Sequence, residues 1–148
     1  MVILREFTPG NAPLLQEAGY PDESTEKIEA LITQWNTHSF DDRYFEMLGI
    51  WDGENLVGCI SLYQHTGEVI SIGPEIFPAH RRKGYGRQAL ALACQRGREL
   101  GYKIVCQQIR TDNIASIALH TSLGFAGSGQ IFTNARGNPV LICLKSLV

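Results

Sequence analysis

The sequence has few cysteines, no long apolar run and no excess of positive charge, and each shortage excludes a class of protein. Its four cysteines are widely spaced and form no CxxC pair, so we expect reduced thiols and no metal site. No segment approaches the roughly 20 consecutive apolar residues that cross a bilayer. Arg5 and Glu6 interrupt the first apolar run, unlike a signal peptide. We therefore expect a cytoplasmic protein that does not associate with membranes.

The size and charge of the chain limit its organisation. Its 148 residues are 44% hydrophobic and 19% charged, which predicts one globular domain over residues 1–148. The formal net charge of −2 argues against a nucleic-acid partner, which would favour a basic face over much of the domain. No repeat, low-complexity tract or linker divides the sequence.

The spacing of apolar residues predicts a mixed succession of strands and helices. Strands are expected at Val2–Phe7, Tyr44–Trp51, Leu56–Tyr63, Glu68–Phe77 and Lys103–Arg110. Helices are expected at Pro9–Ala18, Asp22–Thr37, Arg87–Leu100 and Asn113–Ser122. Two closing strands should flank the turn Asn134–Asn138. This order predicts a mixed α/β (α+β) fold.

The most informative segment is Ala79–Ala89, with the sequence AHRRKGYGRQA, which joins an apolar, β-branched strand to a helix. Gly84 and Gly86 lack a Cβ atom, so a ligand can approach the backbone closely. The N–H groups of the first helical turn have no partner inside the helix, and the helix dipole adds positive potential there. Four cations lie close together in this segment: Arg81, Arg82, Lys83 and Arg87. Together these features predict a site for a pyrophosphate group.

Two other phosphate-binding motifs fit this segment less well. Gly84, Gly86 and Ala89 satisfy the loose GxGxxG/A pattern of dinucleotide-binding folds, and Asp112 could serve as the acidic residue. Too few residues follow Asp112, however, to build the second half of such a fold. A P-loop is excluded because Lys83 precedes Gly84, whereas that motif requires GK[ST].

Two segments resemble motifs of the GNAT N-acetyltransferase superfamily, which binds acetyl-coenzyme A. Arg81–Gly86 matches its [Q/R]xxGx[G/A] signature, and Asn113–Phe125 resembles its NxxAxxLYxxxGF segment. The two motifs stand in the family's order, and with the order of strands the resemblance covers about Arg43 to Val148. It implies the GNAT fold, a mixed and mostly antiparallel sheet of about seven strands, splayed between the fourth and fifth and flanked by about four helices.

The resemblance also implies an activity and a set of ligand-binding residues. The activity is acetyl transfer from acetyl-CoA to a primary amine, on a small molecule or a protein, by direct attack through a tetrahedral intermediate in a monomer or homodimer. Pro74 and Pro78 interrupt pairing near the end of their strand, which indicates free backbone groups for the pantetheine arm, or else an irregular turn. The expected coenzyme-binding residues are Ile76, Phe77, Arg81, Arg82, Lys83, Gly84, Tyr85, Gly86, Arg87, Asn113 and Ser116.

The residues expected to move protons depart from the family pattern. His120 stands where the family usually carries a tyrosine as the acid for the leaving thiolate, and it can alternatively complement the dipole of its helix. Gln108 stands where some relatives carry a glutamate. Our first candidate for the base is therefore Glu75, acting through water, with Glu68 and His65 as alternatives and surface solvation as the competing explanation for each.

Two further questions are which residues hold the amine acceptor and whether the protein catalyses a reaction. Acidic and aromatic residues between Asp22 and Phe45, together with Glu46, are candidates to hold a cationic amine, or else are solvated and core residues. Because positions 108 and 120 are unusual, the alternative function is a catalytically weak acyl-CoA-binding or regulatory module. A nucleotide-binding oxidoreductase is the third hypothesis.

Overall fold

A single eight-stranded sheet forms the centre of the protein, seen in a computed structural model that describes all residues 1–148. The strands are β1 (Ile3–Glu6), β2 (Ser39–Phe40), β3 (Arg43–Asp52), β4 (Asn55–Gln64), β5 (Val69–Ile76), β6 (Ile104–Arg110), β7 (Ala126–Thr133) and β8 (Pro139–Ser146). Their order in the sheet is β1-β3-β4-β5-β6-β8-β7, and β2 pairs with β3. All neighbours are antiparallel except β5 and β6.

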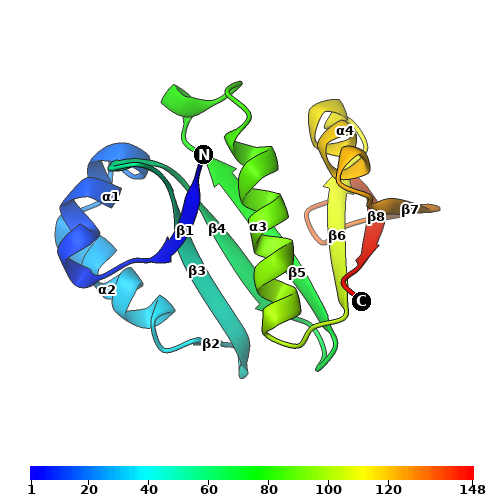
Figure 1. The fold of residues 1–148 in the computed structure, drawn as a ribbon, viewed down its shortest axis with the longest axis horizontal. Helices are drawn as coiled ribbons and strands as arrows, with labels where there is room; N and C mark the ends of the chain where they lie inside the picture. Colours follow the sequence, from blue (N-terminus) through cyan, green and yellow to red (C-terminus); the bar gives the residue numbers. More distant parts are fainter.

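Four α-helices and two short 3-10 helices join these strands. The α-helices are α1 (Ala12–Gly19), α2 (Thr25–Trp35), α3 (Tyr85–Glu99) and α4 (Ile114–Ser122), and the 3-10 helices are η1 (Pro9–Asn11) and η2 (Pro78–His80). Figure 1 shows α3 lying across the middle of the sheet and α4 beyond the end of β6. No helix is long and apolar enough to cross a bilayer.

The expected order of elements is confirmed, with small differences at the boundaries. The helix predicted from Asp22 begins at Thr25, because the Ser24 side chain caps it by accepting a hydrogen bond from the Lys27 N–H at 3.2 Å. Strand β2 was not expected. It forms a hairpin with β3 through Asp41 and Asp42, both at positive φ, where the sequence lacks the glycine that usually marks such a turn.

The splay expected between the fourth and fifth strands is present between β5 and β6. These parallel strands pair only at Val69 with Ile104 and at Ile70 with Val105. Beyond Ile70, β5 continues to Ile76 while paired with β4 alone. Figure 1 shows the two strands diverging towards the ends that carry α3 and α4.

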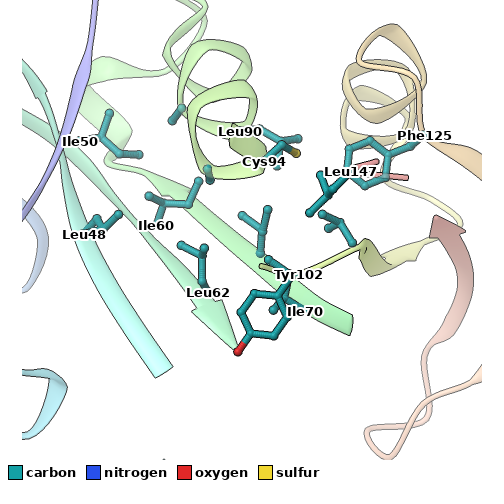
Figure 2. Packing of buried hydrophobic residues seen from close by; sticks show 14 of the residues in the cluster. Leu48, Ile50, Ile60, Leu62, Ile70, Leu90, Cys94, Tyr102, Phe125 and Leu147 are labelled. Carbon is teal, nitrogen blue, oxygen red and sulfur yellow. The ribbon is translucent and has the colours of Figure 1, made fainter. Parts of the chain in front are cut away.

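Two apolar clusters hold the helices on opposite faces of the sheet. On one face α3 packs Leu90 and Cys94 against Ile60 and Ile70 in a cluster that reaches Phe125 and Leu147 (Figure 2). On the other face, side chains of α1 and α2 pack with residues of β4 and with the segment after β5, a cluster that contains Leu15, Ile28, Ile32, Cys59 and Phe77. These clusters fix the helices in place against the sheet whose strands β5 and β6 diverge.

The approach of β4 to the end of β5 depends on one glycine. Gly58 lies opposite Ile76, and a Cβ atom at Gly58 would come within 2.2 Å of the Glu75 carbonyl oxygen. Without that atom, the Phe77 N–H donates to the Val57 carbonyl at 2.9 Å. β5 is therefore anchored on its β4 side as far as Phe77, just before the segment that leads into α3.

Candidate active site

The turn before α3 presents a row of free backbone donors. None of the six N–H groups from Arg82 to Arg87 has a hydrogen-bond partner within the protein. Arg82 and Gly84 have φ values of 64° and 83°, so left-handed residues shape the turn that leads into α3. A non-glycine residue in this conformation is strained, and such strain concentrates at functional sites. Successive unpaired amides at a helix N-terminus form an anion-binding site.

The basic side chains of this turn have no carboxylate partners. None of the five salt bridges involves Arg81, Arg82, Lys83 or Arg87. Arg81 Nε donates to the Ile76 carbonyl at 2.9 Å, and Arg87 Nη1 donates to Ser122 Oγ at 2.6 Å. These neutral partners hold two of the guanidinium groups in place without cancelling their charge.

Gly86 leaves open space over the start of α3. A Cβ atom there would meet only Ile76 Cγ1 at 3.7 Å and Leu119 Cδ2 at 3.9 Å, which are ordinary contacts. The packing of the protein does not require a glycine at this position. The absence of a side chain at Gly86 therefore leaves room for a ligand against the backbone.

A cleft of about 800 Å³ lies where β5 and β6 separate. Residues from β4, β5, β6, α4 and the turn between β4 and β5 line it, and they are Ser61, Tyr63, His65, Thr66, Val69, Ser71, Ile72, Gly73, Pro74, Cys106, Gln107, Gln108, Ile109, Ser116 and His120. None of these side chains is a carboxylate, an ammonium or a guanidinium. The cleft is polar but formally uncharged apart from its two histidines.

Alternate backbone groups of β5 face this opening. Because Phe77 donates to Val57, the antiparallel pattern directs the backbone groups of Ile72, Pro74 and Ile76 away from β4. Pro74 has no N–H, and the Ile72 N–H is bonded to a side chain of β6. Ile76 therefore carries the free N–H of this edge of β5, close to the turn with the free amides.

Gln107 replaces the missing ladder between β5 and β6. Its side chain is buried, and its Oε1 accepts from the Ile72 N–H at 2.8 Å while its Nε2 donates to the Ile72 carbonyl at 2.7 Å. A side-chain amide thus pairs with Ile72 as a strand residue would. Sequence reasoning missed Gln107, although a polar residue between Val105 and Ile109 on the core-facing positions of a strand was a usable signal.

His120 is buried against the same amide. Its Nδ1 lies 2.7 Å from the Ser116 carbonyl oxygen, so Nδ1 carries the proton and donates it there. Its Nε2 then accepts from Gln107 Nε2 at 3.3 Å. The ring packs edge-on against Phe125 with centroids 4.9 Å apart. These contacts fix the orientation of the imidazole at the wall of the cleft.

The two polar residues expected on α4 are close to this histidine. Asn113 caps the helix, because its Oδ1 accepts from the Ser116 N–H at 3.1 Å. Ser116 lines the cleft, with its hydroxyl 3.4 Å from His120 Nδ1. The structure brings Ser116 and His120 together with Ile72 and Pro74 of β5.

Glu75 does not line the cleft and contacts α1 and its following turn instead. Tyr20 Oη donates to Glu75 Oε1 at 3.4 Å, and Cys59 Sγ lies 3.9 Å from the same hydroxyl. Burial, with the Glu75 charge as a smaller cause, raises the pKa of the Cys59 thiol to about 12, so this thiol stays protonated. Burial also raises the pKa of Tyr20, and the nearby thiol and carboxylate add to that effect.

One expected acceptor residue is excluded by the structure. Glu46 is 1% exposed, and its carboxylate accepts from Arg96 at 3.0 and 3.2 Å and from the Tyr44 hydroxyl. This side chain fastens β3 to α3 and has no access to an acceptor in the cleft. The sequence did not reveal that Glu46 is buried. A glutamate is rarely buried unless it is paired, and its partner Arg96 lies on another element.

Comparison with known proteins agrees with this geometry. The model of the acetyltransferase (GNAT) family matches residues 10–125. The chain belongs to this family. Among solved GNAT acetyltransferases, the microcin C7 self-immunity acetyltransferase MccE, in complex with acetyl-CoA and AMP, has a TM-score of 0.82, 18% identity and coverage of 98% of this chain and 92% of that chain. Spermidine N-acetyltransferase from Vibrio cholerae, in complex with CoA and spermine, has a TM-score of 0.75, 20% identity and coverage of 99% and 95%.

A shorter stretch of this chain has a higher sequence identity to a curated enzyme. The L-methionine sulfoximine/L-methionine sulfone acetyltransferase of Salmonella typhimurium is 39% identical over 56 residues, which make up 38% of this chain. The match spans 33%, about a third, of that relative's length. The family and the GNAT fold are thus established for this chain.

Replacement of Gln107 by leucine tests the clamp between β5 and β6. Gln107→Leu keeps the volume but leaves the N–H and carbonyl of Ile72 unpaired, so we expect a loss of about 2–4 kcal/mol in the free energy of unfolding. Gln108→Leu is the matched control, because Gln108 is exposed on the same strand and should change stability by less than about 0.5 kcal/mol. Equal midpoints for the two variants in urea unfolding would contradict this role.

Proposed function

We propose that this protein transfers the acetyl group of acetyl-CoA to a primary amine. The observation that carries the proposal is the row of six free amides at the start of α3, in a protein that also has a cleft between two diverging strands. Membership of the acetyltransferase family supports it, as do the acetyl-CoA and CoA bound in the structural neighbours.

The residues present fit the pyrophosphate and the pantetheine arm of coenzyme A. The pyrophosphate would be held by the amides from Arg82 to Arg87, with the charges of Arg81, Lys83 and their neighbours adding attraction. The pantetheine arm would lie in the splay as an added strand and bond to the backbone of Ile76, because both expected groups of Phe77 are already bonded, its N–H to Val57 and its carbonyl to His80. Tyr85, Gly86, Asn113 and Ser116 would lie beside the arm. Tyr85 is itself held by Asp52, whose carboxylate accepts its hydroxyl at 2.6 Å.

The chemistry requires three functions from the protein. A neutral amine must lose a proton as it attacks, the tetrahedral oxyanion must be stabilised, and the thiolate must leave. For the oxyanion, Pro74 lacks an N–H and the N–H of Ile72 is occupied, and the free N–H of Ile76 is the one that would bond to the pantetheine arm. His120 is our candidate acid for the thiolate, acting once a proton on Nε2 replaces the hydrogen bond from Gln107. Glu75, the first candidate base from the sequence, lies outside the lining of the cleft and would have to act through water.

Gly86→Ala separates coenzyme binding from folding. The new methyl group fits the protein but occupies the space over the α3 amides, so we expect the affinity for acetyl-CoA to fall at least tenfold. Alanine favours a helix over glycine by about 1 kcal/mol, so the thermal midpoint should stay the same or rise. Calorimetric titration with acetyl-CoA and thermal unfolding measure the two effects, and unchanged affinity would place the coenzyme elsewhere.

Thiol release distinguishes an enzyme from an acyl-CoA-binding module. With acetyl-CoA and a panel of amines that includes amino acids, polyamines and peptides, the transferase should release free CoA at a rate that depends on the amine. Free thiol can be followed with a chromogenic disulfide reagent. Tight binding of acetyl-CoA without amine-dependent release would favour the regulatory module, and preferential binding of NADH would favour the oxidoreductase.

His120→Ala and His120→Phe test the acid function. If His120 protonates the leaving thiolate, both variants should lower kcat by roughly 10-fold to 100-fold and change its pH dependence, while acetyl-CoA binding persists. Because His120 is buried, far-UV circular dichroism and the thermal midpoint should be measured for both variants to show that they fold. An unchanged kcat and pH profile in folded variants would exclude the function.

A further inference from the structure

His65 lies on the face of the cleft opposite to α3. Ile70 and Ile72 of β5 pack in the cluster with α3, so Ser71 and Gly73 point to the other face. Tyr63 and Ser61 are paired with these two residues across the β4–β5 ladder and share that face. His65 follows Tyr63 after one intervening residue and lines the cleft with it.

A chain of hydrogen bonds fixes the tautomer of His65. The Ser71 hydroxyl has one hydrogen, which it donates to the Cys106 carbonyl at 2.5 Å. Ser71 Oγ must therefore accept from His65 Nε2, which lies 2.6 Å away. His65 Nε2 carries the proton, and Nδ1 has a lone pair with no partner in the protein. Tyr63, with its ring perpendicular to the imidazole and centroids 5.5 Å apart, supports the orientation.

The charges around His65 favour its neutral form. Partial burial lowers the pKa of His65 below its ordinary value of 6.5, and the positive charge of Arg43 at the start of β3 lowers it further. Burial raises the pKa of the Cys106 thiol on β6, so this neighbour is uncharged at neutral pH. Glu68, in the same turn, and Ser71, from β5, complete the surroundings. His65 is therefore unprotonated at pH 7 and able to accept a proton.

We propose that Nδ1 of His65 accepts the proton of the attacking amine, an inference that rests on the transferase function proposed above. The amine nitrogen forms a bond to the thioester carbonyl carbon, one N–H proton passes through water to Nδ1, and the carbon–sulfur bond breaks to release the CoA thiolate. His65 becomes imidazolium and returns its proton to solvent. Ser71 is a positioning residue that holds Nε2 and so leaves Nδ1 free to accept the proton.

The pH dependence of kcat/KM tests this assignment. In the wild type, protonation of His65 should abolish its function as base, so kcat/KM should rise with pH through a midpoint below 6.5. His65→Gln should lower kcat/KM by about 100-fold at pH 7 and remove that rise, while the acetyl-CoA affinity stays within twofold. Imidazole added to His65→Ala should restore part of the rate. Ser71→Ala should lower kcat/KM by less than His65→Gln does and should keep the rise of kcat/KM with pH.

Glu75→Gln provides the competing arm of the experiment. If His65 is the base, Glu75→Gln should keep the rise of kcat/KM with pH, with its midpoint below pH 6.5. The assignment would be overturned by a normal rate and pH profile in folded His65→Gln. It would also be overturned if only Glu75→Gln lost the rise of kcat/KM with pH. Neither result would contradict the transferase function. A wild-type protein that binds acetyl-CoA but never releases thiol with any amine would overturn both.

Discussion

The site depends on the point at which the ladder between β5 and β6 ends. Two residue pairs hold these parallel strands together, and beyond them the buried amide of Gln107 bonds to both backbone groups of Ile72. A longer ladder would close the cleft, and a shorter one would leave more buried backbone groups unpaired, at a cost of about 1–3 kcal/mol for each. The amide therefore ends the ladder without such a loss, and its second N–H fixes His120 at the wall.

The turn before α3 carries a concentration of positive charge that no carboxylate in the protein neutralises. Arg82 adopts a strained left-handed conformation, and the amides that follow it are free. Four cations without carboxylate partners repel one another, so this turn lowers the stability of the free protein. Both costs would be offset by a bound anion. One ligand group, the pyrophosphate proposed above, would therefore account for both the strain and the charge.

Much of the fold and the turn with the free amides before α3 was predictable, because the signals are local. Glycine positions and basic side chains mark the turn before α3, and the period of apolar residues marks the strands. The connections across the sheet were not predictable in the same way. Gln107 and Ser71 act through partners that lie 35 residues away in the chain, and Glu46 pairs with Arg96 at a separation of 50. Such pairs follow from strand register and helix packing, which composition and spacing do not encode.

Charge and neutral polarity are concentrated in two separate parts of the protein. Charge gathers around the free amides at the start of α3, where an anionic coenzyme would be held, and the cleft between β5 and β6 has no carboxylate, ammonium or guanidinium in its lining. An ammonium ion that entered this cleft would find no counter-charge, so the environment favours the neutral amine, which is the nucleophilic form. A cleft without carboxylates also leaves a neutral histidine as the group best suited to receive the proton. The polarity of the lining thus selects the reactive form of the acceptor before any bond is made.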